Sequence, residues 1–236
     1  MSVQVTLSAN AGVSLTLGGK KIWVDALHDT PTGGFSTLTP EMVRRMETCE
    51  AFQDPDMIVF THCHGDHYSH ALTAQARMRW PRARLVLPEL HFSDQELLEG
   101  AEVYKALGDV HLRFFRLTHE HPETLDVPHY GLIISHGKTT VLIAGDCAIA
   151  NPQLAAAVGN ERVDLAVLNF PWLTLPRGRE YIAKQLRPAR LLVYHLPFLA
   201  DDAALYRAAA ERAASLLPSC SDIRILGDFL QTERYD

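Results

Sequence analysis

The chain has 236 residues, of which 47% are hydrophobic and 21% are charged, an ordinary composition for a globular protein with a substantial core. Its formal net charge of −6 argues against a general nucleic-acid binder, and no apolar run reaches the roughly 20 residues that a bilayer span needs. The N-terminus has neither a basic start nor an uninterrupted apolar stretch, so no signal peptide is expected. The four cysteines form no Cys-x-x-Cys pair, which favours a reducing, cytoplasmic setting.

Hydrophobic patterning predicts alternating strands and helices in the first half of the chain. Alternating apolar and polar residues with a Gly-Gly turn predict strands within 3–25. The Thr-Pro step at 39–40 predicts a helix N-terminus, and the capping box at 93–96 predicts another helix that ends near Gly108. The other expected elements are a loop at 27–38, a buried strand at 57–61, a helix at about 67–79, and strands at 83–88 and 111–117.

The second half repeats the pattern of the first. The glycine-rich hairpin that leads to an aspartate at 12–25 recurs at 131–146. The buried strands at 56–61 and 82–88 recur at 164–169 and 188–195, and the last strand at 111–117 recurs at 222–226. Two such units would pack sheet against sheet, with helices on both outer faces. We therefore predict a single domain, 1–236, of two similar halves (about 1–117 and 118–236), with further helices at 151–159 and 201–217.

A cluster of metal-ligand side chains follows a buried strand. The stretch Thr-His-Cys-His-Gly-Asp-His at 61–67 places three imidazoles and a carboxylate within six residues. Because side chains at i and i+2 share one face of an extended segment, His62 and His64 can reach the same ion. If the chain turns into a helix after the glycine, Asp66 and His67 would address a second ion. A polar loop that happens to be rich in histidine is the simpler alternative.

This motif resembles the metal-binding signature of the metallo-β-lactamase superfamily, and the resemblance extends over most of the chain. It implies an α/β fold, the four-layer αββα sandwich. It also implies ligands at later strand ends: Asp146 after a Gly-Asp step, His195 after an apolar strand, and His119, for which His121 is the alternative. The implied sites are His62, His64 and His119 for one ion, and Asp66, His67 and His195 for the other, with Asp146 bridging. By its place in the repeat, Asp25 is the candidate for orienting the imidazoles.

The resemblance implies a metal-dependent hydrolase. Two divalent ions, zinc first with manganese or iron as alternatives, would hold a bridging hydroxide that cleaves a small ester, lactone or phosphodiester. Asp66 would be the catalytic residue that moves a proton to the leaving group. The spacing of the motifs is closest to the L-ascorbate-6-phosphate lactonase-like and ribonuclease Z-like branches. Neither the physiological substrate nor the bond cleaved can be read from the sequence.

Two other functions stay open on the sequence. A metal-binding protein of the same fold without turnover would keep the ligands, and a diiron redox protein of the flavodiiron type would carry Glu at the position of His64. The expected partner is a small-molecule substrate, with no membrane and no nucleic acid, and a homo-oligomer is open. Phe35 and Trp172 are candidates for an apolar pocket, and Cys147 for a small buried residue. Six further histidines are interpreted as surface or turn residues: His28, His70, His91, His111, His129 and His136.

Overall fold

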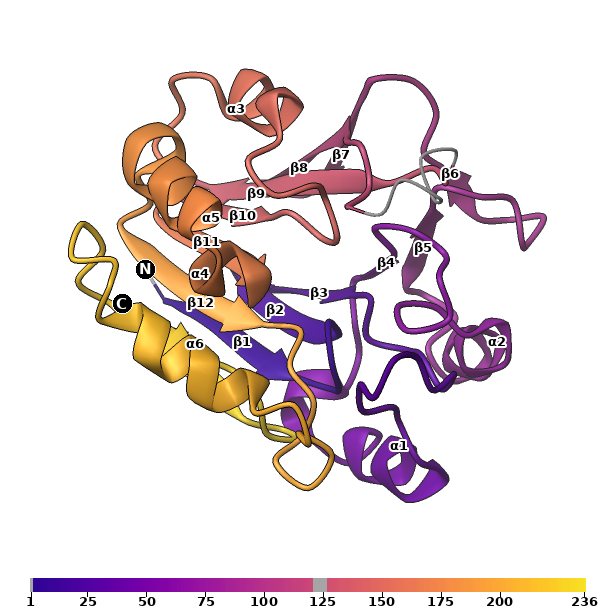
Figure 1. Cartoon of the computed structure of the whole chain (residues 1–236). Coiled ribbons are helices and arrows are strands. Elements are labelled where there is room, and N and C mark those ends of the chain that lie inside the picture. Colours follow the sequence, from indigo (N-terminus) through magenta and orange to yellow (C-terminus); the bar gives the residue numbers. More distant parts are fainter. Residues whose placement is uncertain (1, 121–126) are drawn as a thin grey trace.

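The computed structural model describes residues 2–120 and 127–236, which form two sheets of seven strands each within this part of the chain (Figure 1). The first sheet has the order β14-β1-β2-β3-β4-β5-β6. Its strands are β1 (Val3–Leu7), β2 (Val13–Leu17), β3 (Lys20–Val24), β4 (Met57–Val59), β5 (Arg84–Leu87), β6 (Glu96–Leu97) and β14 (Thr232–Tyr235). The second has the order β13-β12-β11-β10-β9-β8-β7. Its strands are β7 (Glu102–Leu107), β8 (Val110–Arg116), β9 (Tyr130–His136), β10 (Thr139–Ile143), β11 (Leu165–Asn169), β12 (Arg190–Tyr194) and β13 (Ile223–Ile225).

Helices cover the outer face of each sheet. They are α1 (Pro40–Met46), α2 (His70–Arg79), α3 (Pro152–Val158), α4 (Pro171–Thr174), α5 (Pro176–Tyr181) and α6 (Tyr206–Ala214), with the short helices η1 (Glu50–Phe52) and η3 (Ile182–Leu186). In the described residues none of them combines the length and apolar character needed to cross a bilayer.

Three hydrophobic clusters separate four layers. The largest lies between the sheets and contains residues of both, such as Val59 and Ile143. A second packs the other face of the second sheet against α3 to α6, and a third packs the other face of the first sheet against α1 and α2. The helix–sheet–sheet–helix order confirms the predicted four-layer αββα sandwich, and it explains why central strands such as β11 are buried along their whole length.

The sheets repeat one topology. In each, an antiparallel hairpin (β2–β3, β9–β10) continues into parallel strands (β4–β5–β6, β11–β12–β13). The predicted correspondence of 111–117 with 222–226 is wrong, because β8 pairs with β9 as β1 pairs with β2, and β6 is the strand that matches β13. The second sheet thus begins at Glu102, before residue 117, and the C-terminal β14 returns to the first sheet.

The predicted helix at 93–108 is also wrong, because this segment forms β6 and β7. The side chain of Gln95 accepts hydrogen bonds from the backbone N–H groups of His91 and Phe92 and donates one to the carbonyl of Glu89, so it closes a loop instead of capping a helix. Along β7 the exposure then alternates with a period of two, and a turn at Gly108, with φ +61°, leads into β8. The local capping pattern was overridden by strand pairing.

Two other predicted helices are shorter than expected. The chain makes a turn after His64, and α2 starts at His70, where the hydroxyl of Ser69 accepts a hydrogen bond from the N–H of Leu72. The helix predicted from residue 201 starts at Tyr206, because the Asp202 carboxylate accepts from the first backbone N–H groups of α6. The helix starts predicted at 39–40 and at 151 are confirmed, and the side chains of Thr39 and Asn151 cap these helices.

Helices α4 and α5 meet in a contact that only glycine permits. A Cβ atom at Gly178 would lie 2.3 Å from the carbonyl oxygen of Trp172, whose side chain is fully buried in the second cluster. Because the nearest atoms belong to the backbone of α4, they cannot give way as the end of a flexible side chain could. The contact sets how closely α5 packs against α4.

We expect Gly178→Ala to lower the free energy of unfolding by about 1–3 kcal/mol, although alanine normally favours a helix over glycine by about 1 kcal/mol. Urea titration followed by circular dichroism measures it. The control is Gly227→Ala, where the nearest atoms to the added Cβ lie at 3.7 Å and belong to the flexible Arg207 side chain. Equal stabilities of the two variants would contradict this reading of the α4–α5 contact.

Glu96 links the edges of the two sheets. Its carboxylate accepts from Arg84 on β5, at 2.6 and 2.9 Å, and lies 2.7 Å from the Lys105 ammonium on β7. The hydrogen bonds from Arg84, helped by Lys105, lower the pKa of Glu96 from 4.5 to about 2. The folded state therefore binds fewer protons than the unfolded state between these two pH values, and the stabilisation is lost as the pH falls through this window.

We expect Glu96→Gln to lower the unfolding free energy at pH 7 by about 0.5–1 kcal/mol, because the partly exposed carboxylate is screened by solvent. The difference from the wild type should be constant above pH 4.5 and shrink as the pH falls towards 2. Urea titrations at several pH values between 7 and 3 test this, with Glu99→Gln at an exposed neighbouring position as the control. A difference that grows on acidification would contradict the assignment.

Candidate metal centre

The predicted ligand side chains come together at one edge of the sandwich. His62 follows β4, Asp146 follows β10 and His195 follows β12, and all three strands run parallel to a neighbour. The carboxyl ends of parallel strands lie at the same edge of a sheet, where open α/β sheets bind their ligands. A backbone hydrogen bond of 2.9 Å from Tyr130 to the carbonyl of Thr61 joins the two sheets at this edge.

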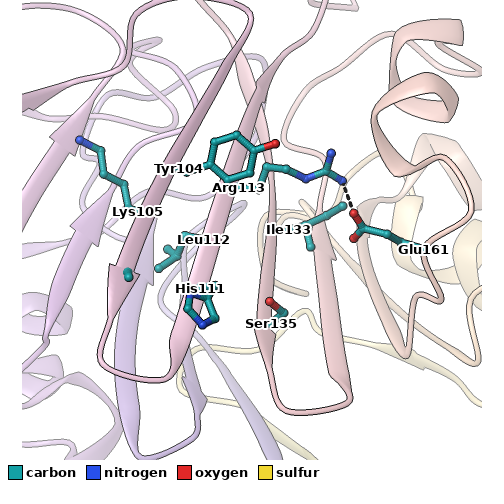
Figure 2. Close-up of a pocket in the computed structure, with 9 residues that line it drawn as sticks. Tyr104, Lys105, His111, Leu112, Arg113, Ile133, Ser135 and Glu161 are labelled. Carbon is teal, nitrogen blue, oxygen red and sulfur yellow. Dashed lines mark hydrogen bonds and ion pairs between the residues drawn. The ribbon is translucent and has the colours of Figure 1, made fainter.

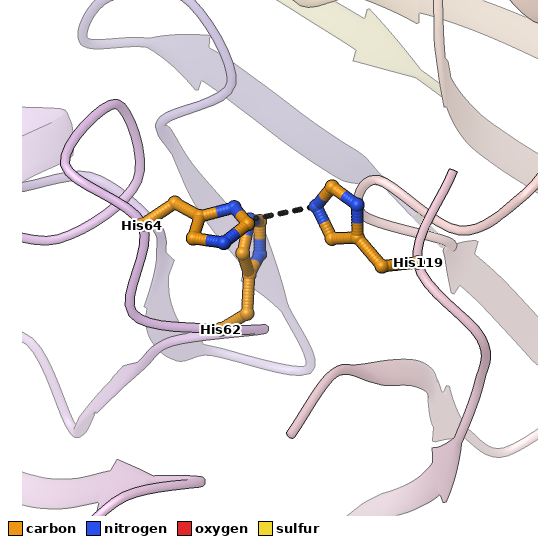
Figure 3. A group of neighbouring side chains, drawn as sticks. All are labelled: His62, His64 and His119. Atoms are coloured by element: carbon orange, nitrogen blue, oxygen red, sulfur yellow. Dashed lines mark hydrogen bonds between the residues drawn. The ribbon is translucent and has the colours of Figure 1, made fainter. Parts of the chain in front are cut away.

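The first group consists of His62, His64 and His119, whose ligand nitrogens lie within 4.8 Å of one another (Figure 3). The Nε2 atoms of His62 and His119 are 3.4 Å apart. His62 and His119 are buried, whereas His64 is half-buried at the mouth of the site. His119 is held at the end of β8 by a bridge to Cys147, the residue after Asp146.

The second group consists of Asp66, His67, Asp146 and His195, also with all ligand atoms within 4.8 Å. Asp146 lies between the two histidines: one carboxylate oxygen is 3.3 Å from His67 Nε2 and the other 3.3 Å from His195 Nε2. Asp66 Oδ2 lies 3.9 Å from His195 Nε2. The motif at 61–67 thus reaches both groups, through a turn and not through the helix predicted after the glycine.

Asp25, fully buried at the end of β3, orients one histidine of each group. A carboxylate only accepts hydrogen bonds, so His67 Nδ1–H donates to it at 2.9 Å and the Thr61 hydroxyl donates at 2.6 Å. The Thr61 oxygen is then the acceptor for His62 Nδ1–H, at 3.0 Å. Nδ1 of both imidazoles is thereby engaged, so Nε2 is the nitrogen that faces each group and would bind a metal ion.

Charges in the site favour a bound cation. Burial lowers the pKa of His62 well below its usual value, which keeps this imidazole neutral. Burial acts in the same direction on His67, but the carboxylates of Asp146 and Asp25 outweigh it and raise its pKa well above the usual value. The carboxylate of Asp146 has a pKa well below its usual range, since the charges of His195 and His67 outweigh burial. The second group thus attracts positive charge to the point between its carboxylates.

Two residues that contact Asp146 were not predicted from the sequence to be part of the site. His129, interpreted there as a surface or turn residue, is fully buried, and its Nε2 accepts a 3.0 Å hydrogen bond from the backbone N–H of Asp146. Burial lowers the pKa of His129 to about 3, so the ring is neutral and can accept. Asn169, at the end of β11, donates to Asp146 Oδ1 at 3.4 Å. Asn169 could have been predicted as a site residue, because it is a polar residue at the end of an apolar strand. No pattern in the sequence indicates that His129 is a site residue.

Two corners of the chain at the site have left-handed backbone. Asp25 has φ +51° and His195 φ +59°, conformations that cost energy for residues other than glycine. Hydrogen bonds hold them there: Asp25 N–H donates to the carbonyl of Val59, and His195 N–H to that of Asn10. Gly145 has φ +56°, and a Cβ atom at this position would lie 2.6 Å from His129 Nε2, so the position requires glycine.

Both groups open into a cavity of about 760 Å³. Its lining contains His64, Asp66, His119, Asp146 and His195, and the remaining wall is Thr32, Gly33, Phe35, Gly65, Glu120, Asn169, Phe170, Pro171, Leu175 and Tyr206. The predicted pocket residue Phe35 therefore lies at the site. The other predicted pocket residue, Trp172, is instead packed in the core. Cys147 is buried in the same core cluster, as predicted.

A second hollow, of about 470 Å³, lies on β7, β8 and β9 and contains none of the predicted site residues (Figure 2). Its main charged group, the guanidinium of Arg113, is bound by Glu161 at 2.7 Å. The cavity with the two donor groups is the better candidate for a functional site because buried imidazoles and carboxylates of separate elements converge there.

The nature of the donor atoms fits divalent metal ions. Each group offers imidazole nitrogens, and the second adds two carboxylates, a set used by zinc, manganese and iron. His121, the alternative to His119, lies outside the described residues. All seven residues predicted as ligands are thus found in two adjoining groups, whereas their binding of metal stays a prediction.

Comparison with known proteins agrees with this geometry. The model of a family described as "Beta-lactamase superfamily domain" matches residues 20–218. No curated protein matches the sequence. One similar solved structure is a possible metal-dependent hydrolase from Veillonella parvula, with 16% identity and a TM-score of 0.71 over 99% of both chains. Another is Igni18, a metallo hydrolase from Ignicoccus hospitalis, with 17% identity and a TM-score of 0.67 over 100% of this chain and 99% of that one.

The fold also occurs in a protein with different chemistry. CmlA, a diiron β-hydroxylase from Streptomyces venezuelae, is 16% identical with a TM-score of 0.66, over 99% of this chain and 54% of its own. At such identities the structural likeness shows the fold alone. The family match spans most of the sequence, including both donor groups, and the chain accordingly belongs to the β-lactamase superfamily domain family.

Proposed function

We propose that this protein is a dinuclear metal-dependent hydrolase that cleaves a small ester, lactone or phosphodiester. The observation that supports it is the convergence of seven nitrogen and oxygen ligands from separate strand ends into two adjoining groups at the floor of one cavity. His62, His64 and His119 would hold one ion and Asp66, His67 and His195 the other, with Asp146 between them. Bound divalent ions, zinc first with manganese or iron as alternatives, would lower the pKa of a water towards about 7 and polarise the substrate oxygen.

The side chains around this centre would divide the remaining work. Asp66 lines the cavity, so its carboxylate is placed to receive a proton from the attacking water and pass it to the leaving group. Asp25 and Thr61 orient His62 and His67 so that Nε2 of each ring faces its donor group, and His129 and Asn169 hold Asp146 by its backbone N–H and its carboxylate. Glu120 connects the loop that carries His119 to α5, since its carboxylate accepts a hydrogen bond from the guanidinium of Arg177 at 2.9 Å.

We expect His64→Ala to lower kcat/KM by more than about 100-fold, beyond the 10–100-fold that loss of an outer hydrogen-bond partner costs. His64 is half-buried at the cavity, so the circular dichroism spectrum should stay that of the wild type. The assay follows 4-nitrophenyl acetate, γ-butyrolactone and methyl 4-nitrophenyl phosphate with zinc, manganese or iron(II), alongside metal content per chain. The exposed His70→Ala is the control.

Each result separates the candidate functions. Two ions per chain with turnover of one substrate class supports the hydrolase. Two ions per chain without turnover of any of the three substrates favours a metal-binding protein. Reversible reduction of the protein that occurs only with iron bound favours a diiron redox protein. Full activity in His64→Ala would contradict the ligand assignment.

We expect Asp25→Asn to weaken the binding of both ions by about 10–100-fold. One carboxylate oxygen accepts from the Thr61 N–H and the other from the Thr61 hydroxyl and His67, so an amide would set its own N–H group against one of these donors. Competition with a chelator measures this affinity. The control is Asp56→Asn at the opposite end of β4, where the carboxylate accepts from the N–H of Lys21 at 2.9 Å. Asp56→Asn should lower stability and leave metal affinity unchanged; a selective loss of one ion in Asp25→Asn would refute the shared role.

A further inference from the structure

Three aromatic rings form one wall of the site cavity. Phe35, Phe170 and Tyr206 come from the loop after β3, the end of β11 and the start of α6. The ring centroids of Phe170 and Tyr206 are 4.7 Å apart, and those of Phe35 and Tyr206 are 6.1 Å apart with an angle of 13° between the planes. All three are half-buried. We call these three rings the aromatic wall.

The aromatic wall adjoins the second donor group directly. The ring of Phe35 meets the imidazole of His195 edge to face, with centroids 4.9 Å apart. A substrate whose reacting atom lies between the donor groups would therefore place its neighbouring substituent against these rings. Pro171 and Leu175 extend the same apolar side of the cavity.

The wall is held in place by partly buried polar contacts away from the donor groups. The hydroxyl of Ser36, next to Phe35, is buried; it donates to the Asp201 carboxylate at 2.6 Å and accepts from the N–H of Phe198 at 2.7 Å. Asp202 accepts from the N–H of Tyr206 at 2.8 Å and so fixes the first turn of α6. The loop with Phe35 and the helix with Tyr206 are thus tied to the same short segment, and the rings are pre-organised for a ligand.

The cavity offers little to a strongly anionic substrate outside the donor groups. Among the described residues that line it there is no Lys or Arg. The nearby Arg177 is paired with Glu120, which itself lines the cavity. Phosphate groups are normally bound by Arg or Lys, so a tail of phosphates would find no partner here.

We propose that the aromatic wall selects a small uncharged ester or lactone with a flat apolar substituent next to the scissile carbonyl, in preference to a phosphodiester. This inference rests on the proposed hydrolase function and names its substrate class. In the reaction, the oxygen of water bonds to the carbonyl carbon, the C–O bond to the alcohol oxygen breaks, and that oxygen takes one proton of the water. The products are a carboxylic acid, which loses its proton to solvent, and an alcohol.

The test compares α-benzyl-γ-butyrolactone with γ-butyrolactone, and 4-nitrophenyl acetate with methyl 4-nitrophenyl phosphate, on the metal-loaded protein. We expect the benzyl group to raise kcat/KM by about 10- to 100-fold, the gain from burying a phenyl ring. Phe170→Ala and Phe35→Ala should remove most of this ratio, and Tyr206→Phe should keep it because the ring remains. The matched control is Phe92→Ala. The Phe92 ring lies outside the cavity and stacks on His70 with centroids 4.5 Å apart, so its removal should leave the ratio of kcat/KM between the two lactones unchanged.

A binding measurement separates failure of this inference from failure of the hydrolase function. The carbocyclic ketones 2-benzylcyclopentanone and cyclopentanone have no bond to hydrolyse, and calorimetric titration gives their affinities for the wild type and Phe170→Ala. If no ester or lactone is cleaved but the benzyl ketone binds tighter only with the wall intact, the hydrolase function fails and the recognition of an apolar group stands. Equal ratios in the wild type and both wall variants, or a preference for the phosphodiester, would overturn the inference even if hydrolysis is observed.

Discussion

The buried carboxylate of Asp25 is the constraint on which the rest of the site depends. It sits at the end of β3, strained into a left-handed corner, and accepts hydrogen bonds from the backbone and hydroxyl of Thr61 and from His67. A buried charge without such donors would be strongly unfavourable, so the chain after β4 is forced to approach it. The same bonds decide which nitrogens of His62 and His67 face the other side chains of their donor groups. One side chain thereby couples the position of a loop to the chemistry of both donor groups.

The paired sheets turn this local arrangement into a complete site. Ligands from the second sheet, Asp146 and His195, leave parallel strands at the same edge at which the motif of the first sheet lies. The hydrogen bond between Tyr130 and Thr61 holds the two edges in register. Since the interior between the sheets is filled by apolar side chains, the relative position of the two halves of the site is set by packing and not by the ligands themselves.

The site has two sides of different character. On the floor, imidazoles and carboxylates gather around positions suited to cations, whereas the wall next to His195 consists of aromatic rings without a nearby unpaired basic group in the described part of the chain. Hydrogen bonds of Ser36 and Asp202 hold that wall and make no contact with the donor groups. The segments that position the wall can therefore vary while the floor is kept, which is how one fold accommodates different substrates.

Local sequence was enough to predict the elements whose signals are local. The strands around the Gly-Gly turn, the capped starts of α1 and α3 and the ligand spacing at 61–67 depend on neighbours in the chain, and the structure contains them. The capping box at 93–96 failed because Gln95 bonds within its own loop, and because β7 pairs with β8 through a two-residue turn at Gly108, a hairpin signal that competes with the capping pattern.

By itself, the sequence determined which residue types follow its apolar strands, and its resemblance to the metallo-β-lactamase superfamily then implied the seven candidate ligands. Only the tertiary structure decided that His129 supports Asp146, that His28 is buried with its Nε2 on the carbonyl of Ala9, and that Phe35 and Tyr206 share a wall. The physical reason is that each contact joins residues of different segments, which lie next to each other only once the strands and loops have folded together.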